Sequence, residues 1–301
     1  MKSAYLIVAH GNFNLLKKLI LQLDHPSNDI FIHIDKKVKS VDYKEYEQLT
    51  RHSKVVCLRK RVSVIWGHIT QPQATLLLLE AACSAKNYDY YHLLSGIDYP
   101  IKSNQYILDF LETNNGKLFI GFQPWDATID FKFGLYHYIP QNIQNRYIVM
   151  KWVNRIILKI ERLFSIKHFK DTKSLSKGCN WWSITDDVAR MLVENQKDIL
   201  KMYKYTSCSD EVFVQTIVAS NPNLLHRVYD FYNEYHSCLR CIDWERGKPY
   251  TFKIDDFDML KASPALFARK FSEEHMDIID KIERELYESI GYYGVYTYAR
   301  E

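Results

Sequence analysis

The feature that most constrains the fold is an alternation of short apolar strands and helices along the N-terminal third of the chain. The predicted strands are residues 4–10, 29–35, 54–58 and 89–96, and the predicted helices between them are residues 12–23 and 71–85. Strands that pair in parallel need crossover connections, and the crossover helices bury both faces of the sheet. The alternation therefore predicts an α/β fold with a doubly wound, largely parallel sheet.

Polar residues follow several of these strands. They are His10 and Gly11 after the first strand, Asp35 to Lys37 after the second, and residues 95–98 after the fourth. Ligands of such sheets bind beyond the carboxyl ends of the strands, so we expect the pocket there. No GxGxxG or GxxxxGK[ST] segment follows any strand, which disfavours ordinary dinucleotide and P-loop binding.

Composition limits the class of protein. The chain has 301 residues, 47% of them apolar, and a net charge of +4, so it can bury a large core but is too weakly basic for a dedicated nucleic-acid binder. Its six cysteines are scattered, and we expect reduced thiols. There is no signal-peptide pattern and no run of the roughly 20 apolar residues that cross a bilayer. We therefore expect a cytoplasmic protein.

The chain is less regular and richer in aromatic loops and helices after Gly121. Helices are predicted over residues 146–166 and 186–196. No low-complexity linker separates this part from the first. We expect two continuous halves of a single domain, residues 1–121 and 122–301.

Two adjacent carboxylates, Asp210 and Glu211, open a predicted helix in the segment SCSDEVFVQTIV, with Ser207 or Ser209 as its cap. Acids in a first helical turn are stabilised by the helix dipole by about 0.3–1 kcal/mol, which explains the pair without any catalytic role. A carboxylate can also accept the proton of an attacking hydroxyl, a contribution of roughly 10²–10⁴-fold to a rate. The segment alone leaves both interpretations open.

Carboxylates paired for metal binding are missing at the end of the fourth strand, where HLLSGIDYPIKS contains only Asp98. The one literal DxD pattern begins at Asp256 and is predicted to be the exposed start of a short helix. Without a metal, a diphosphate leaving group needs cations from the protein. Arg269 and Lys270, in the apolar frame ALFARKF, are candidates.

Six motifs carry a family resemblance: HIDKK, the WG…QA segment from Trp66, LLSGIDYPIKSN, GCNWWSIT, SDEVFVQTI and LFARKF. In this order, from Ala4 to Phe271, they resemble the core-2/I-branching β-1,6-N-acetylglucosaminyltransferases and the related peptide O-xylosyltransferases, and the chain looks like a bacterial-type member. The resemblance implies a GT-A glycosyltransferase that inverts the anomeric carbon. It would move a sugar, GlcNAc in the first instance, from a UDP-sugar to a hydroxyl of a glycan or lipid-linked saccharide, without a metal or other cofactor.

The resemblance also implies site residues. Glu211 matches the catalytic base, and Lys270 matches the lysine on the diphosphate. The other residues implied for the nucleotide-sugar are Val8, Asp35, Trp66, Asp98, Arg269 and Lys248. The family's second diphosphate cation has no clean counterpart, and Arg246, Lys248 or Lys253 could replace it.

Trp181 and Trp182 in GCNWWSIT are expected to bind the acceptor sugar. Adjacent strand residues point to opposite faces, so one ring should line the pocket and the other the core.

Three alternatives stay open: a xylosyltransferase-like enzyme, a metal-dependent GT-A transferase that uses Asp98, and a non-catalytic carbohydrate-binding module with the same fold. Loss of activity in a chelator would distinguish the metal-dependent transferase from a metal-free enzyme. Measurable UDP-sugar hydrolysis would exclude the non-catalytic module.

Residues 146–173 hold eight Lys or Arg and two acids. Lys151, Arg155, Lys159 and Arg162 are expected on one helical stripe, opposite an apolar stripe of Ile148, Trp152, Ile156, Ile160 and Leu163. Such a helix can lie on an anionic membrane or pack against the protein's own core. The first interpretation places the protein peripherally on the inner membrane.

Overall fold

The computed structural model describes residues 1–124 and 133–288 of the chain. Within these residues, a six-stranded sheet has the order β3-β2-β1-β4-β7-β6. Its strands are β1 (Ser3–Ala9), β2 (Asn28–Ile34), β3 (Lys54–Cys57), β4 (Tyr90–Ser95), β6 (Phe119–Ile120) and β7 (Trp182–Thr185). The first four strands of this order are parallel, and β7 and β6 pair antiparallel at the far edge. The prediction of an α/β fold with a largely parallel sheet is confirmed.

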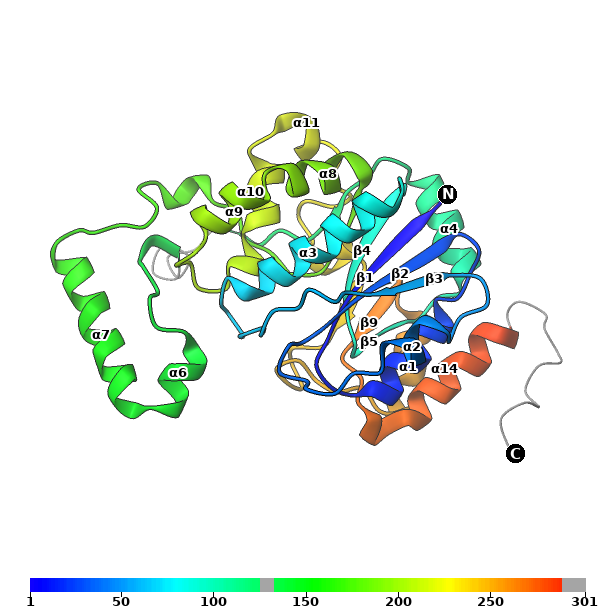
Figure 1. The fold of residues 1–301 in the computed structure, drawn as a ribbon. Coiled ribbons are helices and arrows are strands. Elements are labelled where there is room, and N and C mark those ends of the chain that lie inside the picture. The colour runs from blue at the N-terminus through cyan, green and yellow to red at the C-terminus, as the bar shows by residue number, and fades with distance from the viewer. Residues whose placement is uncertain (125–132, 289–301) are drawn as a thin grey trace.

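Helices cover both faces of this sheet (Figure 1). The N-terminal helices are α1 (Phe13–Gln22), α2 (Tyr43–Glu47), α3 (Thr70–Ala85) and α4 (Asn104–Thr113). The second half contributes α6 (Gln141–Arg146), α7 (Ile148–Leu163), α8 (Asp186–Glu194), α9 (Gln196–Met202), α10 (Phe213–Ala219), α11 (Pro222–Leu225), α12 (Glu234–Cys238), α13 (Phe257–Ala262) and α14 (Met276–Glu288). Helices α3 and α8 lie on one side of the sheet, and α1, α2 and α14 lie on the other.

The two faces are apolar because β1 alternates between two cores. Tyr5 and Ile7 belong to the core that includes α1 and α14, whereas Ala4 and Leu6 belong to the core that includes α3 and α8. A strand with a helical layer on each side must be apolar at every position, which is why residues 4–9 read as a continuous apolar run.

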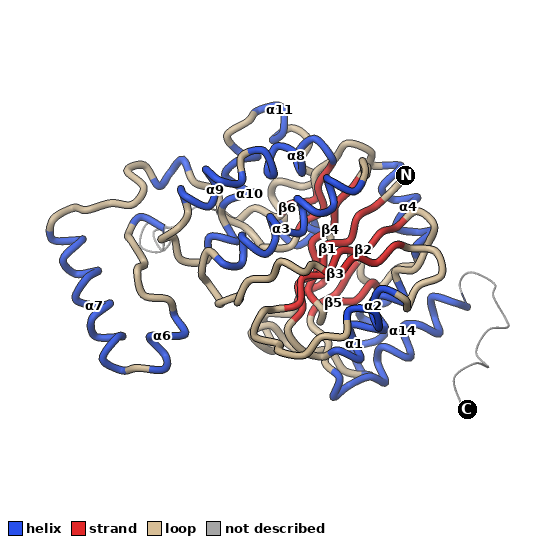
Figure 2. Tube along the Cα trace, viewed as in Figure 1, coloured by secondary structure: helices blue, strands red, loops and turns tan. Residues whose placement is uncertain are grey.

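A second, three-stranded sheet has the order β5-β9-β8, with β5 (Asp98–Pro100), β8 (Arg240–Ile242) and β9 (Phe267–Arg269). It lies next to the central sheet (Figure 2). Strand β5 follows β4 after two residues and contains the Tyr-Pro of the HLLSGIDYPIKS segment. Its antiparallel pairing with β9 sets Asp98 opposite Arg269.

Most predicted elements match the observed ones within one or two residues, and two differ. The helix expected over 146–166 is observed as α7, which ends three residues earlier, and the extended residue Tyr147 separates it from α6, which was not predicted. The helix expected to start at Asp210 starts instead at Phe213, and Asp210 and Glu211 form a separate 3₁₀ turn, Ser209–Glu211. Within residues 1–124 and 133–288, no helix is both long and apolar enough to span a membrane.

Arg240 joins the two sheets through a buried guanidinium group. It donates hydrogen bonds to the carbonyl oxygens of Cys238 (2.7 Å), Leu93 (3.2 Å) and Trp182 (3.1 Å), and its residue is only 1% exposed. Burial lowers the pKa of Arg240, since the charged form loses hydration. The residue thus connects β8 to β4 and β7, where the central sheet changes from parallel to antiparallel pairing.

We predict that Arg240→Met lowers the free energy of unfolding by about 3 kcal/mol or more, because three buried carbonyl groups would lose their charged donor. Urea unfolding followed by circular dichroism measures this. Arg51→Met, at an exposed position, is the matched control and should change stability by less than about 0.5 kcal/mol. Equal unfolding midpoints for the two variants would contradict the role assigned to Arg240.

Candidate functional site

The carboxyl ends of β1, β2 and β4 meet at one edge of the central sheet. Val8, which is half-buried, lies between His33 of β2 and Ser95 of β4 in the strand register. The backbone N–H of Asp35 donates to the carbonyl of Ala9 (2.8 Å), so the chain leaving β2 stays against β1. This edge is where the strand order predicts a ligand site.

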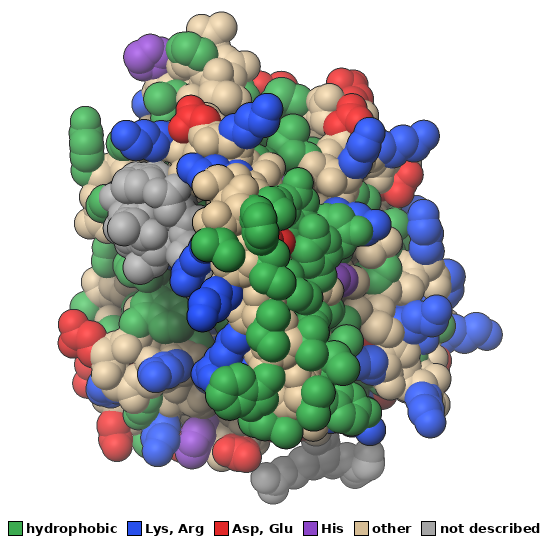
Figure 3. Space-filling model, turned by 90° about the vertical axis from the view of Figure 1, so that its left-hand side faces the viewer, with side chains coloured by type: hydrophobic (Ala, Val, Ile, Leu, Met, Phe, Trp, Pro, Cys, Tyr) green, Lys and Arg blue, Asp and Glu red, His purple; other side chains and the backbone are tan. Residues whose placement is uncertain are grey.

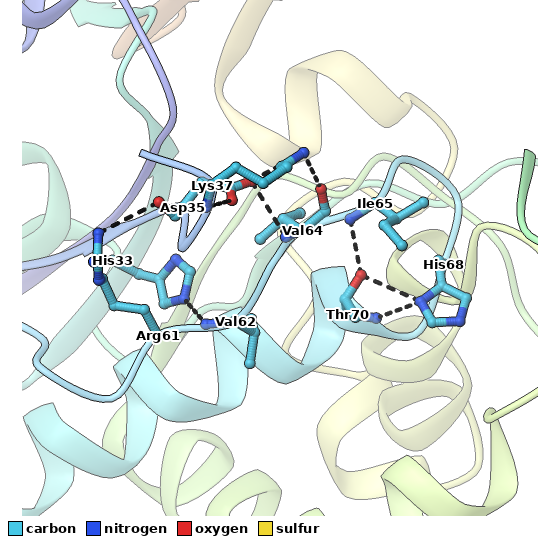
Figure 4. A network of polar contacts seen from close by, with 9 residues as sticks. All are labelled: His33, Asp35, Lys37, Arg61, Val62, Val64, Ile65, His68 and Thr70. Carbon is cyan, nitrogen blue, oxygen red and sulfur yellow. Dashed lines mark hydrogen bonds and ion pairs between the residues drawn. The ribbon is translucent and has the colours of Figure 1, made fainter. Parts of the chain in front are cut away.

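Asp35 holds the loop that leads to Trp66. Its carboxylate is buried and accepts hydrogen bonds from the backbone N–H groups of Lys37 (2.8 Å) and Val64 (3.2 Å). The Lys37 ammonium lies 3.3 Å from the same carboxylate and donates to the Val64 carbonyl (2.8 Å). Figure 4 shows both Asp35 oxygens turned toward these two residues. Asp35 therefore shapes one wall of the site by fixing residues 62–65.

Trp66 is presented to solvent by a tight turn. The turn has positive φ at Gly67 (68°) and is closed by a hydrogen bond from the Ile65 N–H to the Thr70 hydroxyl (2.9 Å), and the Trp66 side chain is 71% exposed. The Gly67 carbonyl accepts from the backbone N–H of Cys208 (2.9 Å). This bond attaches the Trp66 turn to the segment that carries Glu211.

The two acids of this segment have different surroundings. Asp210 is buried, and its carboxylate accepts a hydrogen bond from the Gln71 amide (2.9 Å) at the start of α3. Glu211 is partly exposed, with 28% of its side chain accessible. Cys208, with φ of 51°, turns the chain sharply before this pair. The pair therefore lies in a 3₁₀ turn just before α10 and not in the first turn of that helix.

Lys177 forms an ion pair with Glu211. Its ammonium lies 3.8 Å from the Glu211 carboxylate and donates to the Gln123 side-chain carbonyl (2.6 Å). The Gln123 amide in turn donates to Glu234 (2.8 Å), whose pKa is raised by burial. The Gly178 N–H donates to the Glu211 carbonyl (2.9 Å). This network attaches the Glu211 turn to Lys177 and Gly178, and through Lys177 to Gln123.

Lys177, Gln123 and Glu234 were not found by sequence reasoning. They come from three separate segments, with Glu234 at the start of α12, and share no spacing pattern. Only Lys177 carried a signal, since it immediately precedes the GCNWW motif.

Asp98 is buried and fully engaged by its own chain. Its carboxylate accepts from the Ser95 N–H (2.7 Å) and the Ser95 hydroxyl (2.8 Å), and it lies 3.3 Å from the Arg269 guanidinium. Arg269 also lies 4.0 Å above the Trp181 ring. The structure therefore brings Asp98, Arg269 and Trp181 together, and the Asp98 carboxylate binds Ser95 and Arg269.

The two tryptophans of GCNWW differ as expected. Trp182 is in β7 and completely buried in the core beside α3 and α8, so its ring is not accessible to a sugar. Trp181 is partly buried, and one ring face is covered by Arg269. Of the two residues assigned to the acceptor, only Trp181 has the exposure that this role needs.

Lys270 follows Arg269 at the end of β9. Its backbone pairs with Tyr250 and Phe252, and the next residue, Phe271, donates to the Ile97 carbonyl (2.9 Å) beside Asp98. Among the described residues, no carboxylate forms an ion pair with the Lys270 ammonium. A cationic side chain on an anchored backbone, with no carboxylate partner among the described residues, is suited to bind an anion.

The three candidates for a second diphosphate cation differ in whether a carboxylate already pairs with them. Arg246 is paired with Asp243 and with Asp256 (2.6 Å), whereas Lys248 and Lys253 are exposed. Asp256 is buried by this pairing, so the expected exposure of the DxD pattern is wrong for Asp256, whereas Asp258 is exposed at the start of α13 as expected. Within residues 1–124 and 133–288, no group of three His, Cys, Asp or Glu side chains is arranged to hold a metal ion.

Comparison with known proteins relates this site to a family. The model of the Core-2/I-Branching enzyme family matches residues 3–263, so the match stops before Arg269 and Lys270. Xylosyltransferase 2 of Mus musculus is 23% identical over 313 residues, and that of Rattus norvegicus is 24% identical over 316. Each alignment covers 96% of this chain but 34% of the relative, so the chain spans about a third of their length.

Two solved structures are also similar. The apo form of mouse xyloside xylosyltransferase 1 aligns with 89% of this chain and 96% of its own, at 11% identity and a TM-score of 0.37. Staphylococcus aureus TarS aligns with 39% of this chain and 21% of its own, at 18% identity and a TM-score of 0.27.

The packing around Gly178 leads to a test of the site's construction. A Cβ atom at Gly178 would overlap the carbonyl oxygen of Gly121, so Gly178→Ala must displace the loop that bonds to Glu211. We predict a loss of about 2 kcal/mol or more in the free energy of unfolding. Gly11→Ala is the matched control, because its Cβ would meet no atom within 4 Å. Chemical denaturation of both variants measures the difference, and equal stability would show that the loop is not closely packed.

Proposed function

Because the chain belongs to the Core-2/I-Branching enzyme family, and is thus a glycosyltransferase, we propose that it transfers a sugar from a UDP-sugar to a hydroxyl with inversion, using Glu211 as general base. The observation that carries the proposal is the difference between the two adjacent acids. Asp210 is buried on Gln71, while Glu211 keeps an accessible carboxylate in a turn that is held on both sides.

The proposed reaction has a single displacement step. The acceptor oxygen attacks the anomeric carbon, Glu211 takes the hydroxyl proton, the new glycosidic bond forms, and the bond from the sugar to the diphosphate breaks to release UDP. A base with a fixed position is needed because misplacement by about 1 Å costs roughly 10²-fold in rate. The ion pair with Lys177 and the Gly178 hydrogen bond support such a position for Glu211.

We propose that the negative charge developing on UDP is stabilised by Lys270 in place of a metal. Two observations support this. The Lys270 ammonium has no carboxylate partner among the described residues, and the Asp98 oxygens are already engaged by Ser95 and Arg269. Lys248 is the proposed second cation, because Arg246 is neutralised by two carboxylates.

The donor sugar is proposed to be GlcNAc or xylose. The family supports GlcNAc by its members' branching activity, and the similarity to xylosyltransferases supports xylose. The acceptor is proposed to be a glycan or a lipid-linked saccharide that lies against Trp181. Incubation with a panel of UDP-sugars, followed by detection of free UDP, identifies the donor.

The first functional prediction compares the two acids. Glu211→Gln keeps the shape and hydrogen bonding of the side chain but removes the proton acceptor, so kcat should fall by roughly 10²-fold or more with near-normal UDP-sugar affinity. Asp210→Asn keeps an acceptor for Gln71 and should lower the melting temperature while leaving much of the activity. Steady-state kinetics and thermal unfolding of both variants test this. A Glu211→Gln enzyme with the parent kcat would place the base elsewhere.

The second functional prediction concerns the leaving group. Lys270→Ala should weaken UDP binding, measured by calorimetry, and lower kcat/KM, because the ammonium contacts the diphosphate in both the substrate and the transition state. Lys54→Ala, at an exposed position of β3, is the matched control and should change neither. EDTA should leave activity unchanged. Activity that is lost in EDTA and restored by manganese would contradict the metal-free reaction and favour a metal site at Asp98.

A further inference from the structure

Helices α6 and α7 form a hairpin that extends away from the sheet (Figure 1). The view onto this side shows hydrophobic side chains gathered over a broad area with Lys and Arg beside them (Figure 3). Five residues of α7, spaced by three or four positions, make up an apolar stripe: Ile148, Trp152, Ile156, Ile160 and Leu163. All five are exposed, for example Leu163 at 77% and Trp152 at 57%. Exposed apolar surface of this extent in one element indicates an interaction site.

The side of α7 that faces the protein is formed by other residues. Its buried members are Asn154, Leu158 and Glu161. The Glu161 carboxylate accepts from the backbone N–H of Tyr136 (3.1 Å), and the Asn154 amide donates to the Gln144 side chain (3.3 Å). Two polar side chains therefore attach the helix to its surroundings, and the apolar stripe does not pack on the protein's own core. This orientation excludes the interpretation in which the apolar stripe packs against the protein's own core.

A row of basic residues borders the apolar stripe. Lys151, Arg155, Lys159 and Arg162 are all exposed, and the Arg155 guanidinium lies 5.0 Å from the Trp152 ring. Both rows face solvent, so they lie side by side and not on opposite faces of the helix as the sequence suggested. The single acid of residues 141–163 is Glu161, which is buried. The exposed surface of α7 is thus apolar and cationic.

One further cation, Arg146, lies with Lys151 at the N-terminal end of this surface. A cavity of about 450 Å³ is lined by Gln144, Asn145, Arg146, Ile148 and Lys151. It adjoins the apolar stripe at Ile148 and is large enough for a phosphate group. An anionic headgroup there would keep its acyl chains toward the stripe.

We propose that the α6–α7 hairpin binds an anionic lipid bilayer, with α7 lying in the plane of the interface. The apolar stripe would enter the acyl region, and the basic row would meet the lipid phosphates. Helix α7 has 16 residues, roughly 24 Å at about 1.5 Å per residue, and carries four cations, so it suits a position on the bilayer and not across it.

Charge favours lipid over a second copy of the chain as the occupant. A second copy would bring the same cationic row against the first, with no exposed acid on either hairpin to offset it. An anionic bilayer complements both properties of the surface. The inference does not depend on the sugar-transfer reaction, because it concerns a surface whose residues take no part in the proposed chemistry.

Vesicle sedimentation tests the proposal directly on the full chain. At low salt, the protein should pellet with vesicles that contain phosphatidylglycerol and much less with pure phosphatidylcholine, and added salt should release it.

The double variant Trp152→Ser/Ile156→Ser should lose vesicle binding. The variant Trp244→Ser, which changes an exposed tryptophan outside the hairpin, should keep it. Lys151→Gln/Lys159→Gln should weaken binding by roughly tenfold or more, since each basic residue contributes roughly fivefold. Lys197→Gln/Lys201→Gln on α9 is its matched control.

Three outcomes would overturn the proposal. One is a parent protein that stays in the supernatant with anionic vesicles at low salt. Another is a Trp152→Ser/Ile156→Ser variant that binds as tightly as the parent. The third is a parent protein that is dimeric by light scattering and ignores vesicles, with a monomeric Trp152→Ser/Ile156→Ser variant, since this assigns the stripe to a second copy. Equal melting temperatures of the variants confirm that their exposed substitutions leave the fold intact.

Discussion

The buried guanidinium of Arg240 connects the parts of the chain from which the candidate site is built. Its hydrogen bonds reach the carbonyl groups of Leu93 in β4 and Trp182 in β7, while Arg240 itself begins β8 of the second sheet. Strand β5, which begins at Asp98, follows β4, the loop before β7 carries residues 177–181, and β8 pairs with β9, which leads to Lys270. A buried cation is costly unless it is hydrogen-bonded, and the carbonyl groups around the two terminal nitrogens of Arg240 fix its position. The relative placement of these three segments depends on it.

The site itself is held from two directions. From one side the Trp66 turn is attached to Cys208 through Gly67, and Gln71 of α3 binds Asp210. From the other side, Gly178 and Lys177 contact Glu211. Segments that are distant in the chain thus converge on one short turn. This convergence separates a buried structural acid from an accessible one, although the two are neighbours in the sequence.

The same division between buried and accessible surface governs the α6–α7 hairpin. Periodicity shows that α7 has an apolar stripe but cannot show what covers it. In the structure Asn154 and Glu161 are directed inward by specific hydrogen bonds, and this rotates Trp152 and Ile156 outward. Helix α7 therefore exposes a continuous apolar stripe, and such an area is unfavourable in water unless a partner covers it.

The sequence by itself determined the fold class and the main elements. A parallel sheet covered by helices on both faces needs continuous apolar strands, such as residues 4–9, and helices with periodic apolar residues, and both patterns are visible in local sequence. The family motifs also pointed to Glu211 and Lys270.

Local patterns could not contain the contacts between distant segments of the chain. The sequence did not show that β9 sets Arg269 beside Asp98, or that Arg246 pairs with Asp256. Lys177, Gln123 and Glu234 had no common pattern to detect. Tertiary structure alone decided these partners, because hydrogen bonds and ion pairs depend on distances in space that residue spacing along the chain does not specify.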